Sequence, residues 1–81
     1  MTMSSKTVLA YAPPGSTVKV IDISGGYGVV RRLYEMGIIP GSELRIVFNG
    51  PGPTVVEKNG TRIAIGKGLA MKILVEVVTH G

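Results

Sequence analysis

Two glycine-rich stretches come nearest to known chemical motifs in this 81-residue chain. Residues 26–31, Gly-Tyr-Gly-Val-Val-Arg, join a strand-like segment to a helix-like one, as a dinucleotide-binding turn does, but Arg31 replaces the third glycine. Residues 60–68 resemble a phosphate-binding loop, yet Gly60 and Gly66 are one residue too far apart, and Gly68 replaces the magnesium-binding Ser or Thr. We therefore interpret the first stretch as the entrance of a helix, whose free N–H groups are able to hold an anion, and the second as a glycine-rich turn between strands.

The remaining reactive side chains do not form a catalytic set. There is no cysteine, which excludes disulfides, thiolate zinc sites and cysteine nucleophiles. The single histidine, His80, has no rigid partner that would make it the base for a Ser or Thr nucleophile, and the five Asp and Glu residues are few. We predict a protein that is not an enzyme, with no catalytic residue, no cofactor and no dedicated metal site. Weak or indirect transition-metal association, through carboxylates and His80, is the less favoured alternative.

Composition indicates one small domain with an aliphatic core. Hydrophobic residues make up 44% of the chain and aromatic residues 5%, while twelve Gly and five Pro disfavour a helical bundle. No apolar run approaches the ~20 residues of a membrane-spanning helix, and segment 8–12 is too short for an export signal. We therefore expect a cytoplasmic protein. Its net charge of +4 favours acidic partners, which include a nucleic acid, an anionic membrane and an acidic protein surface.

Turn signals divide the chain into about five short strands. In segment 42–49, alternation places Leu44, Ile46 and Phe48 on one face, which we interpret as the core face. Asn59-Gly60 predicts a two-residue type I′ hairpin turn. So small a sheet avoids two bare edges by closing, so we expect a mainly β fold: an SH3-like barrel with one short helix after the first strand. The expected strands are 17–23, 42–49, 54–58, 61–65 and 72–78, in a single domain 7–78 between a frayed segment 1–6 and a tail 79–81.

The expected helix runs from Val29 to Met36. Val29, Leu33 and Met36 fall on one stripe at i, i+4 and i+7, and Gly37 stands where a left-handed residue commonly closes a helix. Tyr27 and Tyr34 are seven positions apart, and two interpretations stay open for them. They are either core or rim residues with no further role, or anchors of an interface, where tyrosine is enriched.

The most specific segment is 32–42, Arg-Leu-Tyr-Glu-Met-Gly-Ile-Ile-Pro-Gly-Ser. Together with Pro14-Gly15, Gly25-Gly26 and Ile65-Gly66, it resembles the FeoA-like family of small cytosolic components of ferrous iron uptake, over about residues 8–78. The resemblance implies an SH3-like barrel that acts as a binding module without catalytic residues. Motif positions that would be structural in such a family are Gly26, Leu33, Met36, Gly37, Pro40 and Gly41.

The resemblance also implies a partner. Stand-alone members are thought to act on the membrane ferrous iron permease that carries a cytosolic GTPase domain. The FeoA-like domain also occurs at the C-terminus of metal-dependent transcriptional repressors. We therefore expect a docking surface at the helix, built from Tyr27, Arg31, Arg32 and Tyr34. The alternative is a small basic barrel that either binds nucleic acid or acts as a metal-responsive regulatory module. The few aromatics argue against nucleic acid, and the Val-rich strands are compatible with a homodimer.

Overall fold

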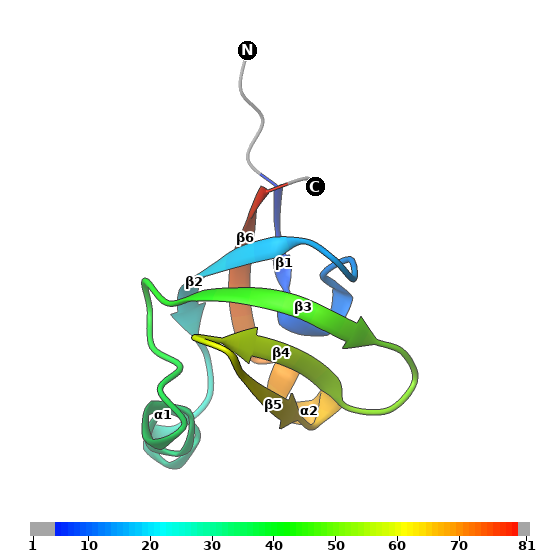
Figure 1. The fold of residues 1–81 in the computed structure, drawn as a ribbon. Coiled ribbons are helices and arrows are strands. Elements are labelled where there is room, and N and C mark those ends of the chain that lie inside the picture. Colours follow the sequence, from blue (N-terminus) through cyan, green and yellow to red (C-terminus); the bar gives the residue numbers. More distant parts are fainter. Residues whose placement is uncertain (1–4, 80–81) are drawn as a thin grey trace.

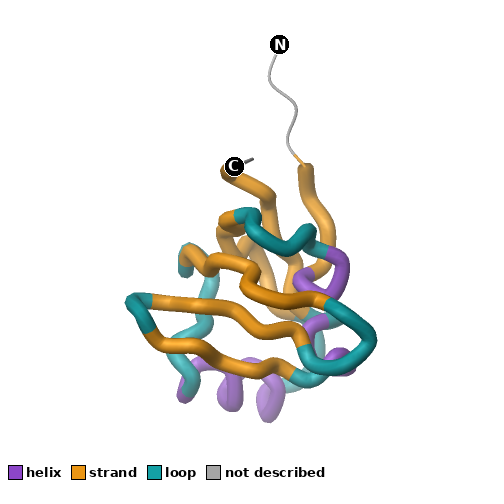
Figure 2. The backbone as a smooth tube through the Cα atoms, turned by 45° about the vertical axis from the view of Figure 1, so that its right-hand side comes forward, coloured by secondary structure: helices purple, strands orange, loops and turns teal. Residues whose placement is uncertain are grey.

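A computed structural model describes residues 5–79 as a mainly β protein, which confirms the predicted fold class (Figure 1). All six strands belong to one antiparallel sheet with the order β1-β6-β2-β3-β4-β5. Figure 2 shows the strands curving around a common interior, with the helical segments at the margins. The elements are β1 (Ser5–Val8), a 3₁₀ turn η1 (Leu9–Tyr11), β2 (Thr17–Ile23), α1 (Tyr27–Glu35), β3 (Glu43–Asn49), β4 (Thr54–Lys58), β5 (Thr61–Ile65), α2 (Lys67–Ala70) and β6 (Ile73–Thr79).

The additional strand is β1, which lies at one edge of the sheet and pairs with β6 from Ser5↔Val77 to Val8↔Leu74. Ser5 and Lys6 had been assigned to a frayed segment, because a short polar run carries no alternating apolar pattern. The rest of that segment, residues 1–4, lies outside the described residues, as do His80 and Gly81 of the expected tail. Thr79 continues β6 one residue past the expected end of the domain.

The core is aliphatic and is shared by strands and helices. It holds one contiguous cluster of buried side chains, to which β2, β3, α1 and β6 all contribute. Each fully buried Leu, Ile or Val contributes about 1.5–3 kcal/mol relative to an exposed position. Neither helix within residues 5–79 is long and apolar enough to cross a membrane. The largest buried side chains are Leu9, Leu33, Ile38, Leu44, Ile46, Ile65 and Ile73.

A β-bulge in β3 reverses the predicted orientation of its last residues. Ile46 pairs with Val56, but Phe48 pairs with Val55. β3 therefore advances by two residues where β4 advances by one. The inward and outward positions exchange beyond this point. The prediction that Phe48 belongs to the core is therefore wrong, because its side chain is 54% exposed, whereas Leu44 and Ile46 are buried as expected.

Candidate functional site

Helix α1 is held against the sheet by one apolar face and a defined C-terminal cap. Leu33 is fully buried, and Val29 and Met36 pack against the core. At the C-terminal end, Gly37 has φ +80°, and the Ile38 N–H donates to the Leu33 carbonyl over 2.9 Å. This pattern, with the Gly37 N–H donating to the Tyr34 carbonyl over 2.9 Å, is a Schellman motif. The face that α1 turns to solvent is consequently fixed.

Bonds from distant segments anchor both ends of α1. The Lys58 Nζ donates to the Gly37 carbonyl over 2.7 Å, which ties the C-terminal end to β4 and places a cation where the helix dipole favours one. Before the helix, the Ser24 N–H donates to the Lys72 carbonyl over 2.8 Å. The N-cap is Gly26, and Gly41, with φ +96°, follows Pro40 in the turn that leads into β3. These contacts make α1 a rigid element on which surface side chains hold defined positions.

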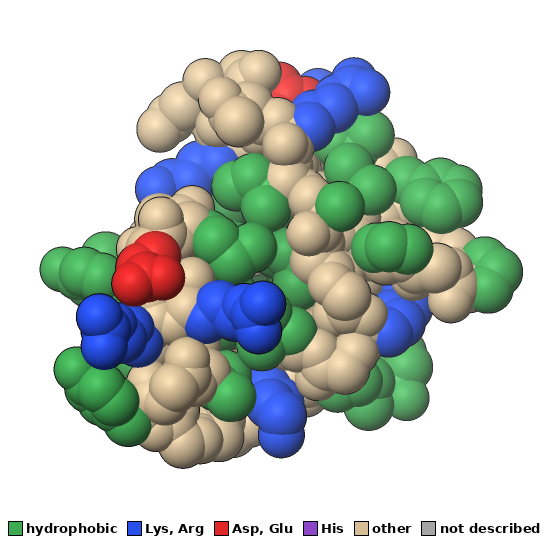
Figure 3. Space-filling view, turned by 90° about the horizontal axis from the view of Figure 1, so that it is seen from below, with side chains coloured by type: hydrophobic (Ala, Val, Ile, Leu, Met, Phe, Trp, Pro, Cys, Tyr) green, Lys and Arg blue, Asp and Glu red, His purple; other side chains and the backbone are tan. Residues whose placement is uncertain are grey.

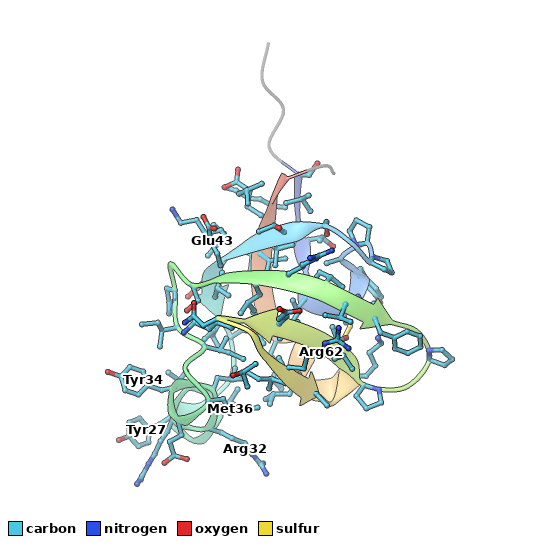
Figure 4. The ribbon with its side chains drawn as sticks, in the orientation of Figure 1. Tyr27, Arg32, Tyr34, Met36, Glu43 and Arg62 are labelled. Atoms are coloured by element: carbon cyan, nitrogen blue, oxygen red, sulfur yellow. The ribbon has the colours of Figure 1, made fainter. Side chains whose placement is uncertain are left out.

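One flank of α1 carries exposed apolar side chains. Tyr27, Val30 and Tyr34 recur at i, i+3 and i+7, which places them on one stripe of the helix. Tyr27 is 79% exposed and Tyr34 65% exposed, and both point away from the sheet in Figure 4. Arg31 lies beside this stripe and pairs with Glu35 over 3.4 Å. Because both side chains are exposed, neither tyrosine belongs to the core, while a rim position without a further role and an interface anchor both stay open. We call Tyr27, Val30 and Tyr34 the tyrosine flank.

The opposite flank of α1 borders a groove. Figure 4 shows Arg32 and Met36 on the side of α1 away from the two tyrosines. The predicted docking surface is thus divided: Tyr27, Arg31 and Tyr34 lie toward one side, and Arg32 lies on the other. The face containing the groove, seen in Figure 3, has apolar side chains between α1 and the sheet, with Lys and Arg side chains around them. The groove has a volume of about 340 Å³ and is lined by Arg32, Met36, Ala64, Ile65, Gly66 and Leu69.

Neither glycine-rich stretch is a turn over its whole length: residues 26–31 supply the N-cap and the first residues of α1, and residues 60–68 run from the hairpin turn through β5 into α2. Asn59 and Gly60 have φ +52° and +81°, as a type I′ hairpin turn requires. Gly66 precedes α2, a helix of only four residues. Among residues 5–79, no group of three or more His, Cys, Asp and Glu side chains is placed to hold a metal ion.

Sequence reasoning missed the contribution of β5 and α2 to the groove. Ala64 and Leu69 carry no motif, and the motifs that include Gly66 do not indicate a groove. These residues meet Arg32 and Met36 only because the chain folds back. The partial signal was Met36, an apolar residue at the margin of the helix stripe, next to Arg32 in angular position around α1. A single sequence does not reveal which non-local segment such a residue faces.

Comparison with known proteins identifies the class to which this fold belongs. The family model described as FeoA domain matches residues 7–77, so the chain belongs to the FeoA domain family. It is 47% identical over 73 residues to the "Putative Fe(2+) transport protein A" of Methanocaldococcus jannaschii, covering 90% of this chain and 89% of that protein.

Two solved structures are similar over nearly the whole chain. A crystal structure of the "Iron Uptake Regulatory Protein (FeoA)" has a TM-score of 0.86 at 33% identity, covering 91% of this chain and 100% of that one. The NMR structure of a FeoA-like protein from Clostridium acetobutylicum has a TM-score of 0.82 at 32% identity, covering 98% and 94%. The fold is therefore the SH3-like fold of this family, as the sequence predicted.

Proposed function

We propose that this chain is a non-enzymatic, cytoplasmic accessory protein of ferrous iron uptake. It docks on the cytosolic, GTPase-bearing region of the membrane ferrous iron permease and modulates transport. The main support for this proposal is membership of the FeoA domain family, together with the similarity to the M. jannaschii protein named as a putative Fe(2+) transport protein. The tyrosine flank supports it, because a fixed helix presents large apolar side chains that the fold itself does not use.

The tyrosine flank has the chemistry of an interface anchor. A Tyr side chain buries a large area on binding, loses little rotamer freedom, and offers a hydroxyl for a hydrogen bond. Tyr27 and Tyr34 are both more than half exposed on a helix whose position is fixed at both ends. Binding therefore requires little rearrangement of the chain, which lowers the free-energy cost of association.

Calorimetric titration of the purified cytosolic region of the permease with the full chain tests this proposal. Removing both aromatic anchors, Tyr27→Ala with Tyr34→Ala, is expected to weaken binding by about 2 kcal/mol or more, which is roughly 30-fold. Neither side chain contributes to the core, so the double variant should remain folded.

Tyr11→Ala is the matched control, since Tyr11 is 69% exposed but lies on η1, which packs against β6 and α2. Its affinity is expected to equal that of the wild type. Absence of any heat with wild-type protein would refute the docking proposal. Equal losses for the Tyr11 and double variants would show that the docking surface is not the tyrosine flank.

A further inference from the structure

The free edge of β5 offers unpaired backbone groups. β5 is the last strand in the sheet order, so within residues 5–79 only β4 pairs with it. In a two-residue hairpin the residues flanking the turn, Lys58 and Thr61, exchange hydrogen bonds, and bonded and non-bonded pairs then alternate along the ladder. Arg62 and Ala64 fall at the non-bonded positions, so their N–H and C=O groups point away from β4. No loop or helix backbone group within residues 5–79 bonds to either residue.

This edge lies beside the groove. Ala64 and Ile65 of β5 line it on one side, and Met36 of α1 and Leu69 of α2 provide apolar walls. An extended segment placed along β5 would therefore pair with the edge through its backbone and rest an apolar side chain on these walls. Addition of a strand to an exposed edge is a recurring mode of peptide recognition, in which the pocket beside the edge selects the side chains.

Arg32 determines the charge that the groove favours. Arg31 is paired with Glu35 and Arg62 with Glu57, but Arg32 makes no hydrogen bond or ion pair within the described part of the chain. Arg32 lines this groove, where a carboxylate of the partner would form a charge-assisted, bidentate pair with its guanidinium. The net charge of +4 attracts the same kind of partner from a distance.

We propose that the groove binds an extended acidic segment of the protein partner as an additional strand on β5. Its backbone pairs with Arg62 and Ala64, an apolar residue lies against Met36 and Leu69, and an Asp or Glu pairs with Arg32. This inference rests on the proposed docking function and assigns the partner a specific conformation. Pairing of two copies through this edge is disfavoured, because it would bring Arg32 and Arg62 of each copy together.

Amide hydrogen exchange, followed by NMR on the ¹⁵N-labelled full chain, tests the site residue by residue. The probes are the purified cytosolic region of the permease and a synthetic hexapeptide that alternates Glu and Val. The amides of Arg62 and Ala64 are expected to exchange at least about tenfold more slowly with a saturating probe, because they become hydrogen-bonded. Ile63 is the internal control, since its amide already faces β4 and should change little.

Two substitutions separate charge from backbone pairing. Arg32→Gln is expected to weaken peptide binding at least about fivefold at low salt, whereas Arg31→Gln, the same change one residue earlier on the other flank, should alter it less than twofold. Ala64→Pro removes the outward N–H, and proline is tolerated at the free side of an edge strand, so binding should fall by more than about tenfold. The exchange data on the wild-type chain stand independently if this variant does not fold.

The outcomes distinguish this inference from the proposed function. Permease binding without protection at Arg62 and Ala64 would overturn the β5 site and leave docking through α1 intact. Protection by the hexapeptide without any binding of the permease would support the β5 site and overturn the proposed partner. Absence of an effect from either probe would overturn both. Protection of these amides by raising the concentration of the chain alone would assign the edge to a second copy instead.

Discussion

Asn49 connects three separate parts of the chain, so its replacement should destabilise the protein far more than a typical strand residue. Its Nδ2 donates to the Leu9 carbonyl over 3.1 Å and to the Ala12 carbonyl over 2.7 Å, which ties η1 to the end of β3. Its Oδ1 accepts bonds from the Thr54 Oγ1, over 2.8 Å, and from the Lys67 Nζ. One amide thus holds together η1, β4 and the start of α2.

The cost of Asn49→Ala follows from these four bonds. The three neutral bonds contribute about 0.5–1.5 kcal/mol each, and the buried Thr54 hydroxyl keeps only its contact with the Lys67 Nζ, at 3.1 Å. The Leu9 carbonyl keeps the Ala12 N–H as a donor, whereas the Ala12 carbonyl depends on Asn49. Asn49 is only partly buried, which limits the loss. We expect a decrease of about 2–4 kcal/mol in the free energy of unfolding, a large part of the ~5–15 kcal/mol of a typical domain.

Urea denaturation, with circular dichroism as the signal, measures this loss through the shift of the midpoint at constant slope. Glu43→Ala is the control, because Glu43 is an exposed residue of the same strand, and its change should stay within about 0.5 kcal/mol. A loss below about 1 kcal/mol for Asn49→Ala would refute the view that this side chain fastens η1 to the sheet.

Three further predictions concern packing and backbone conformation. Leu33→Ala, at a fully buried position of α1, should lower the free energy of unfolding by about 2–5 kcal/mol; a loss under ~1 kcal/mol in the same assay would show that α1 packs through another face. Phe48→Ala should lower the free energy of unfolding by well under the ~3–5 kcal/mol expected for a buried Phe, and a loss in that range would indicate that Phe48 is buried in the core. Gly37→Ala should cost about 1–2 kcal/mol because of its φ of +80°, while Gly68→Ala, with open space around it inside α2, should be neutral or stabilising in thermal unfolding; equal losses at both glycines would contradict this.

Local signals in the sequence predicted much of the fold. The stripe of Val29, Leu33 and Met36, followed by Gly37, located α1 to within two residues at its start, because helix packing and helix closure both leave short-range patterns. Asn59-Gly60 located the hairpin, since a type I′ turn needs two residues at positive φ. The spacing of the turns and the argument against bare sheet edges predicted an SH3-like barrel, and the family resemblance implied the same fold.

Non-local features were beyond the reach of the sequence. The bulge between Ile46 and Phe48 depends on how β3 pairs with β4, and this single irregularity exposes Phe48 and turns Asn49 toward η1. β1 forms a strand only because it pairs with β6. Similarly, the division of Arg31 and Arg32 between two flanks follows from the 100° step of a helix, but the groove beside Arg32 exists only once β5 and α2 are in place.

The rate of ferrous iron uptake in living cells is the most direct test of whether this chain works by docking. Cells that lack the chain would be complemented with the wild type, with Tyr11→Ala, or with the Tyr27→Ala/Tyr34→Ala double variant, at equal abundance. We expect loss of the chain to change the uptake rate, and the wild type and Tyr11→Ala to restore it, while the double variant does not. Full restoration by the double variant, or an uptake rate that does not depend on the chain, would contradict this account.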